Sequence, residues 1–164
     1  MDVTQQELER LAARVGGALQ ARGWRLATAE SCTGGWVAQV VTAISGSSSW
    51  FDRGFVTYSN EAKREMLGVQ ADTLAAFGAV SEATVREMAA GALTRSRADV
   101  TVAISGIAGP AGGSADKPVG TVCFAWALAG RAAETATCHF DGDRRSIRAA
   151  SVQLALQGLL DRLK

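Results

Sequence analysis

Histidine is almost absent from this chain, which has one such residue, His139, among 164. Serine hydrolases most often use a histidine as their general base. His139 falls in a segment with the pattern of a strand, where a lone histidine is more often structural than catalytic. A hydrolase built on this sequence therefore needs a different base.

Cysteine is also scarce, with Cys32, Cys123 and Cys138 as the three in the chain. An odd number with wide spacing is not a disulfide framework, and we expect a protein of the reducing cytoplasm. No pair among these cysteines and His139 has the close spacing of zinc ligands, so we expect no metal site. Cys123 lies in an apolar run and reads as a small core residue.

Neither charge is in excess, since 17 basic and 16 acidic side chains give a net charge of +1. Proteins that bind nucleic acid or membrane surfaces typically carry a basic excess, so we expect neither partner. There is no apolar run of the roughly 18 residues that span a bilayer. Residues 1–6 are too polar for a signal peptide. The length and the 48% hydrophobic content fit one globular domain over residues 1–164.

Helical and strand-like patterns alternate early in the chain, and a hairpin pattern follows late. Thr4 and Glu7 form a capping box before apolar residues at helical spacing, and Gly23 ends that helix. We expect helices at residues 4–23, 34–44, 60–67, 72–77, 81–93 and 143–163, and strands at 24–29, 55–58, 99–105, 119–128 and 131–140. This order indicates an α/β fold, a layered α/β/α sandwich with a mixed sheet in a single domain.

Ser31 stands where an expected strand gives way to an expected helix, in the segment AESCTGG at residues 29–35. A hydroxyl at such a turn is exposed and faces the positive end of the helix dipole. We expect unpaired N–H groups of the first helical turn to bind an anion or a developing oxyanion there. The simpler interpretation is a turn or N-cap serine, and the segment alone is compatible with both.

A lysine can act as the base if its amine is neutral, which requires burial or a nearby cation to lower its pKa by several units. The chain has three lysines: Lys63, Lys117 and Lys164. Lys164 is the terminal residue, and Lys117 lies in a glycine-rich loop. Lys63 lies one turn into a helix that we expect Asn60 to cap. Because a helical lysine is usually a solvated surface group, Lys63 is a candidate base only together with Ser31.

Two further segments are suited to bind a phosphate group. The loop at residues 106–118 contains both prolines, and its glycines let backbone N–H groups approach an anion closely. The segment GDRRSIR at residues 142–148 places Arg144 at the start of the last helix, where guanidinium geometry and the helix dipole favour a phosphate. The alternatives are a tight connection between two strands for the loop and a solvated cationic face for the arginines.

Several segments closely resemble the CinA C-terminal family, in the same order and spacing over nearly the whole chain. They are AESCTGG at 29–35, GFVTYSNEAK at 54–63, GAVSE at 78–82, SGIAGP at 105–110, KPVGTV at 117–122 and GDR at 142–144. The best-known members of this family are nicotinamide-nucleotide amidases. The resemblance therefore implies an α/β fold and an amidohydrolase activity.

The reaction that the resemblance implies is hydrolysis of the carboxamide of nicotinamide mononucleotide (NMN) to nicotinate mononucleotide and ammonia, in pyridine-nucleotide recycling. It implies a serine–lysine mechanism without metal or cofactor, with Ser31 as nucleophile, Lys63 as base and Tyr58 in a hydrogen-bonding or proton-relay role. We expect backbone N–H groups around Thr33 and Gly34 to hold the oxyanion, and the glycine-rich loop or Arg144 to hold the phosphate. The expected substrate-binding residues are Thr33, Gly34, Gly35, Asn60, Ser105, Gly106, Gly109 and Arg144.

Two rival interpretations stay open on the sequence alone. One is a nucleotide-binding module without catalysis, which uses the same loops. The other is a scaffold protein tied to DNA uptake, which the near-neutral charge disfavours. The sequence also leaves a homo-oligomer open, because Trp50 and Phe51 fit either an interface patch or the core.

Overall fold

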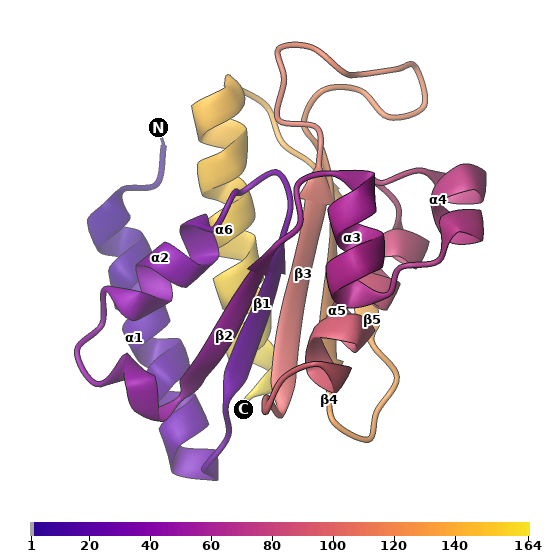
Figure 1. The fold of residues 1–164 in the computed structure, drawn as a ribbon. Helices are drawn as coiled ribbons and strands as arrows, with labels where there is room; N and C mark the ends of the chain where they lie inside the picture. The colour runs from indigo at the N-terminus through magenta and orange to yellow at the C-terminus, as the bar shows by residue number, and fades with distance from the viewer. Residues whose placement is uncertain (1) are drawn as a thin grey trace.

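The computed structural model describes residues 2–164, which fold around one five-stranded sheet (Figure 1). The strands are β1 Leu26–Glu30, β2 Phe51–Val56, β3 Val100–Gly106, β4 Thr121–Leu128 and β5 Glu134–His139. They lie in the order β2-β1-β3-β4-β5. β1 is parallel to β2 and β3, whereas β4 is antiparallel to β3 and β5. The sheet is therefore mixed, as the sequence predicts.

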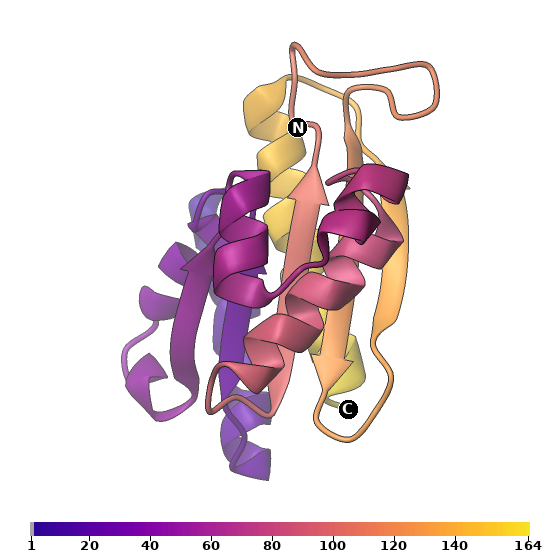
Figure 2. The same cartoon turned by 45° about the vertical axis from the view of Figure 1, so that its right-hand side comes forward.

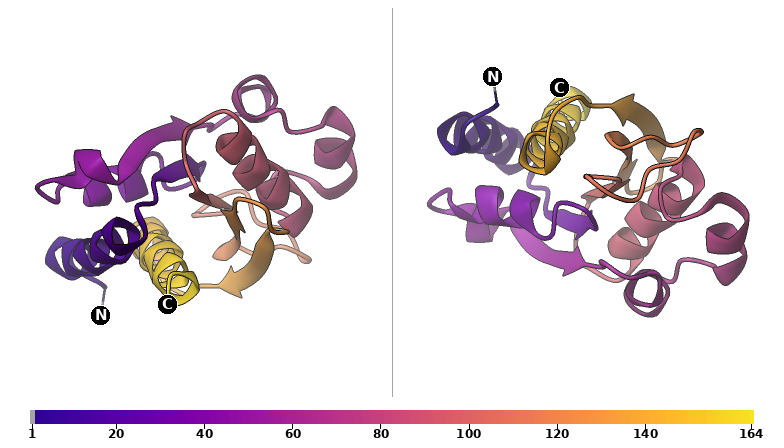
Figure 3. Two further views of the ribbon diagram at one scale, coloured as in Figure 1. Left: turned by 90° about the horizontal axis from the view of Figure 1, so that it is seen from below. Right: turned by 90° about the horizontal axis from the view of Figure 1, so that it is seen from above.

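Helices cover both faces of the sheet, which confirms the α/β/α sandwich (Figure 3). The helices are α1 Gln5–Arg22, α2 Trp36–Thr42, α3 Asn60–Leu67, α4 Ala71–Phe77, α5 Glu82–Thr94 and α6 Arg144–Arg162, with a short 3-10 helix at Ser47–Ser49. α1, α2 and α6 pack on one face and enclose the larger apolar core. α3 and α5 pack on the other face, where α5 runs across the sheet (Figure 2). α4 packs against α5.

The β4 strand is buried along its whole length because it lies between β3 and β5 with helices on both sides. Its large side chains, such as Phe124 and Trp126, point into the core under α6, and their rings stack 5.7 Å apart. Its small side chains, including Cys123, face α5. This division confirms Cys123 as a core residue and lets α5 pack closely on the sheet.

Local sequence signals account for most of the helix ends. The hydroxyl of Thr4 accepts a hydrogen bond from the N–H of Glu7 at 3.1 Å, and the Glu7 carboxylate accepts from the N–H of Thr4 at 2.7 Å. Gly23 ends α1 in the left-handed conformation, with a φ of 67°. Ser81 caps α5 as expected. The capping box and these stops are therefore confirmed.

The starts of α2 and α3 differ from the expected positions. Ser59, not Asn60, caps α3, because the Ser59 hydroxyl accepts a hydrogen bond from a backbone N–H of the first turn at 3.0 Å. Asn60 is instead the first helical residue. α2 begins at Trp36 rather than at Gly34, since Gly34 and Gly35 have φ values of 61° and 100°. These left-handed glycines belong to the turn that follows Ser31, not to the helix.

The β2 strand begins earlier than the expected strand at 55–58 and ends before Tyr58. The first half of this strand is hard to predict from the sequence, because the charged residues Asp52 and Arg53 break the apolar pattern of a buried strand. β2 lies at the edge of the sheet, where charged side chains reach solvent and are well tolerated. The position of Tyr58 just beyond β2 places it in the loop that leads to α3.

Trp50 belongs to the core and not to an exposed interface patch. Its side chain is 2% exposed and packs over Gly16 of α1, where a Cβ atom would lie 2.6 Å from the indole ring. Phe51 is half-buried against the same core. Within residues 2–164, no helix has both the length and the apolar character needed to cross a membrane.

The carboxyl ends of the parallel strands β1, β2 and β3 meet at one edge of the sheet, at the top of Figure 1. The glycine-rich loop after β3 and the start of α6 lie at the same edge (Figure 1). Open α/β sheets bind ligands at this edge. The fold thus gathers Ser31, the β2–α3 connection and the glycine-rich loop in one place.

Candidate active site

Ser31 and Lys63 meet at the carboxyl edge of the sheet. Ser31 directly follows β1, and Lys63 lies near the start of α3. The Nζ of Lys63 lies 3.0 Å from the Oγ of Ser31. It also donates to the backbone carbonyls of Thr57, at 3.0 Å, and Tyr58, at 3.3 Å. The structure therefore brings the expected nucleophile and base into hydrogen-bond contact.

The Lys63 side chain is 1% exposed, unlike a solvated lysine on a helix surface. It takes part in none of the salt bridges among residues 2–164. Burial lowers the pKa of the Lys63 amine below its usual value, and the nearby Cys32 thiol opposes this shift. The site therefore favours the neutral amine that a lysine base requires.

The hydrogen bonds of Lys63 define where the lone pair of a neutral amine points. A neutral amine has two N–H groups and one lone pair. The carbonyls of Thr57 and Tyr58 can only accept hydrogen bonds, so they take both N–H groups. The lone pair then faces the hydroxyl of Ser31, which donates to it. In this arrangement the amine can remove the hydroxyl proton as a general base.

The turn after Ser31 offers two backbone N–H groups as candidate oxyanion donors. The N–H of Gly34 donates to the carbonyl of Ser31 at 3.0 Å, so it is not free as we expected from the sequence. The N–H groups of Cys32 and Thr33 have no hydrogen-bond acceptor within residues 2–164. Cys32 lines the cavity beside Ser31, whereas Thr33 is fully buried and does not, so the candidate oxyanion donor of this turn is the N–H of Cys32.

Glu30 is a buried carboxylate at the site that the sequence analysis did not assign. Its side chain is 1% exposed and accepts hydrogen bonds from the Thr33 hydroxyl at 2.6 Å and from the N–H groups of Val37 at 2.9 Å and Ala38 at 3.1 Å. Burial raises the pKa of Glu30, while these hydrogen bonds oppose the shift. The expectation that the first turn of α2 is open to an anion is therefore wrong, because Glu30 already occupies it.

A cavity of about 290 Å³ opens beside Ser31 and Lys63. The expected site residues that line it are Ser31, Tyr58, Asn60, Lys63, Ser105, Gly106, Gly109 and Arg144. Thr33, Gly34 and Gly35, which were also expected at the site, are not part of this lining. Ala79 and Val80 line the wall near α4, in a segment that matched the family without suggesting a role. Small apolar side chains of this kind give few sequence signals.

Arg144 joins the glycine-rich loop to the β2–α3 connection. Its guanidinium donates to the carbonyl of Gly109 at 2.8 Å and to the hydroxyl of Tyr58 at 3.2 Å. The Tyr58 side chain is 62% exposed, so the hydroxyl points to the rim, whereas the carbonyl of the same residue contacts Lys63. The loop and Arg144, which the sequence offered as alternative phosphate sites, therefore border the same cavity.

The cysteine next to the serine is a poor nucleophile in this environment. Burial raises the pKa of the Cys32 thiol to about 11. The thiol therefore stays protonated near neutral pH, and Ser31 has no thiolate competitor beside it. Cys32, Cys123 and Cys138 are all free thiols. Within residues 2–164, no three His, Cys, Asp or Glu side chains lie close enough together to hold a metal ion.

The structure combines a mixed α/β/α sandwich with a buried lysine that contacts a serine at the carboxyl edge of the sheet. The chain belongs to the CinA C-terminal domain family, whose model matches residues 8–163. This agrees with the resemblance seen in the sequence segments that carry the site.

Relatives of known name match the chain over nearly its full length. It is 59% identical over 157 residues to a protein of Escherichia coli K12 named nicotinamide-nucleotide amidohydrolase PncC, covering 96% of this chain and 95% of that protein. An Enterobacter agglomerans protein of the same name is 52% identical over 158 residues, with 96% of each chain covered. The crystal structure of the competence/damage inducible protein CihA from Agrobacterium tumefaciens has a TM-score of 0.94 at 47% identity, covering 100% of this chain and 99% of that one.

Proposed function

We propose that this protein is a cytoplasmic amidohydrolase that converts NMN to nicotinate mononucleotide and ammonia, in the recycling of pyridine nucleotides. The observation that carries the proposal is the 3.0 Å contact between Ser31 and the buried amine of Lys63 at the mouth of a cavity. The names of the relatives from Escherichia coli and Enterobacter agglomerans support the substrate class.

In the proposed reaction, the neutral amine of Lys63 takes the proton of the Ser31 hydroxyl while the oxygen attacks the carboxamide carbon. The N–H of Cys32 holds the oxyanion that forms. The ammonium of Lys63 then gives its proton to the carboxamide nitrogen, and the C–N bond breaks. Ammonia departs, which leaves an ester between Ser31 and the nicotinoyl group. Water, deprotonated by the same amine, cleaves this ester and regenerates the serine.

The nucleotide part of the substrate has a polar wall to bind against. The glycine-rich loop and Arg144 line the same cavity as the nucleophile. A guanidinium and backbone N–H groups are suited to a phosphate. We therefore place the 5′-phosphate near Arg144 and the carboxamide near Ser31. Loss of the phosphate should weaken binding more than it slows the chemical step.

Ammonia release tests the proposal directly. The purified protein is incubated with NMN, nicotinamide riboside or nicotinamide, and ammonia is measured over time. We expect release from NMN, with a higher KM for the riboside because it lacks the phosphate. If NMN binds in calorimetry but no ammonia appears, the protein is a nucleotide-binding module and the proposal is wrong.

The pH dependence of kcat/KM should follow the protonation of Lys63. Only the neutral amine can act as base, so activity should rise with pH and level off above the Lys63 pKa. Because burial lowers this pKa, the plateau should begin below 10.5, the usual value for lysine. Profiles between pH 5 and 10 for NMN and the riboside provide the test. The phosphate of NMN titrates near pH 6, and the riboside serves as the control without it.

A profile that falls as the pH rises through this range would contradict a lysine base. An acid limb that is present for NMN and absent for the riboside would assign the titration to the phosphate instead.

A further inference from the structure

Arg148 holds the turn that carries the nucleophile, although it lies 116 positions away from Cys32 of that turn in the chain. Its Nε donates to the carbonyl of Cys32 at 3.0 Å, and its Nη2 donates to the carbonyl of Thr33 at 3.2 Å. The guanidinium also lies over the ring of Trp36, 5.5 Å from its centre. Arg148 is half-buried in this position. Both hydrogen bonds of its side chain go to the serine turn, and Arg148 does not line the cavity.

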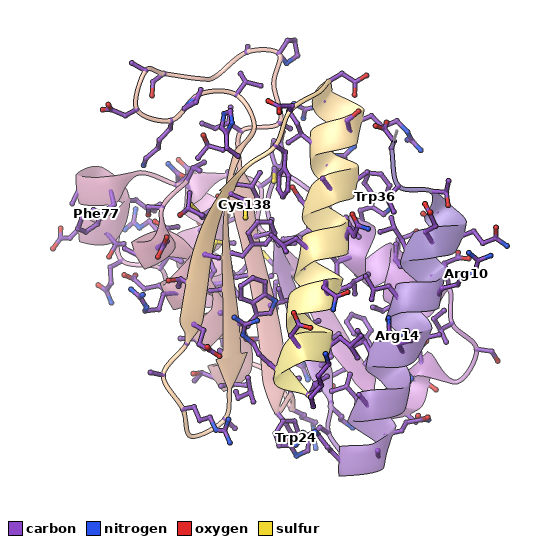
Figure 4. The ribbon with its side chains drawn as sticks, turned by 180° about the vertical axis from the view of Figure 1, so that it is seen from behind. Arg10, Arg14, Trp24, Trp36, Phe77 and Cys138 are labelled. Carbon is purple, nitrogen blue, oxygen red and sulfur yellow. The ribbon has the colours of Figure 1, made fainter. Side chains whose placement is uncertain are left out.

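Trp36 fixes this arrangement between three helices. It is the first residue of α2, its indole N–H donates to Gln5 of α1 at 3.2 Å, and it lies beside α6 in Figure 4. Arg145 also lies over this ring, at the same 5.5 Å. Among the hydrogen bonds of residues 2–164, however, none joins the Arg145 side chain to the serine turn. Both arginines therefore contact the Trp36 ring, but only Arg148 also binds the turn after Ser31.

The bond between Arg148 and the carbonyl of Cys32 fixes the orientation of the peptide between Cys32 and Thr33. In a trans peptide the C=O and the N–H of the next residue point in opposite directions. The N–H of Thr33 is therefore turned away from α6. Thr33 is fully buried and does not line the cavity, so the N–H that can meet the substrate is that of Cys32, which does line it. The two bonds from Arg148 hold the turn that presents this N–H beside Ser31.

We propose that Arg148 is a positioning residue for the reaction, which holds in place the turn that carries Ser31 and the N–H of Cys32. This inference rests on the proposed amidohydrolase function. A side chain that acts on the transition state and does not touch the substrate should change kcat with little change in KM.

The experiment compares Arg148→Met and Arg148→Lys with Arg145→Met, which removes the neighbouring arginine over the same ring. For Arg148→Met we expect kcat to fall by about 10- to 100-fold, with KM within about 3-fold of the wild type. The kcat of Arg148→Lys should lie between those of the wild type and Arg148→Met, because one ammonium cannot reproduce the two-point contact of a guanidinium. Arg145→Met should keep its kcat within about 2-fold. Thermal unfolding confirms that each variant is folded at the assay temperature.

Amide hydrogen exchange over residues 31–35 gives a second measurement that does not depend on activity. Exchange should be faster in Arg148→Met and unchanged in Arg145→Met. The inference is overturned if Arg148→Met and Arg148→Lys keep wild-type kcat, if only KM changes, or if Arg145→Met has the same effect. If the wild-type protein releases no ammonia, the proposed function fails, and unchanged exchange in the Arg148 variants would separately overturn the positioning role.

Discussion

Ser31→Ala and Lys63→Met should each lower kcat for ammonia release by at least about 10²-fold, the usual minimum cost of losing a general base. Ser31→Ala removes the atom that attacks the carboxamide, and the neighbouring Cys32 thiol cannot replace it because its pKa is raised to about 11. Lys63→Met keeps an unbranched apolar stem in the buried site but removes the amine. NMN binding, measured by calorimetry, should persist in both variants.

The double variant should be little worse than the more damaged single variant. The serine is a weak nucleophile without its base, and the base has no purpose without the serine, so their effects do not add. Ser48→Ala and Lys164→Met are matched controls, because both residues are exposed and neither lines the cavity. They should retain wild-type kcat. If either member of the pair can be replaced with more than about a tenth of kcat remaining, the assignment of nucleophile and base is wrong.

Scarcity made the central pair predictable from the sequence. A single histidine and three lysines left few candidates for a base, and the position of Ser31 after an apolar strand marked it as a candidate nucleophile. The strand order then places both residues at one edge of the sheet. Neither observation alone separated Lys63 from a surface lysine. Its 1% exposure, which depends on the packing of α3, could not be read from the chain.

Glu30 and Arg148, which bind the turn after Ser31, were harder to predict than Ser31 and Lys63 themselves. Glu30 stands in the same segment as Ser31, and a carboxylate at the end of an apolar strand was a signal that could have been used. Its partners at Val37 and Ala38 depend on where α2 begins, and two left-handed glycines delay that start. Arg148 reaches the turn from the last helix. No local pattern distinguishes it from the other arginines of that segment.

The exact start of a helix could also not be predicted where two adjacent residues can each cap it. Ser59 and Asn60 are both good N-cap residues, and only the backbone conformation shows that Ser59 takes the role. The edge strand β2 was predicted too short, since its charged residues are typical of a loop and only its pairing with β1 shows that they belong to a strand. In both cases the tertiary structure chooses between local preferences of similar strength.

Gly91→Ala should strongly destabilise the protein, although alanine is the better helix former by about 1 kcal/mol. Gly91 lies inside α5, where α5 crosses the end of α3. A Cβ atom at this position would lie 1.9 Å from the carbonyl oxygen of Leu67, and backbone cannot move aside as a flexible side chain can. We expect the free energy of unfolding to fall by about 2–3 kcal/mol or more, measured by urea denaturation.

The same substitution should damage the site through α3, which carries both Lys63 and Leu67. Pushing the end of α3 away from α5 moves the amine relative to Ser31, and a displacement of about 1 Å can cost about 10²-fold in rate. Gly17→Ala is the matched control, because Gly17 is an exposed helical glycine at which an added Cβ atom would have no neighbour within 4 Å. It should raise stability by about 0.5–1 kcal/mol and leave kcat unchanged. If both substitutions stabilise the protein, α3 and α5 are not packed as described, and the burial that lowers the Lys63 pKa loses its structural basis.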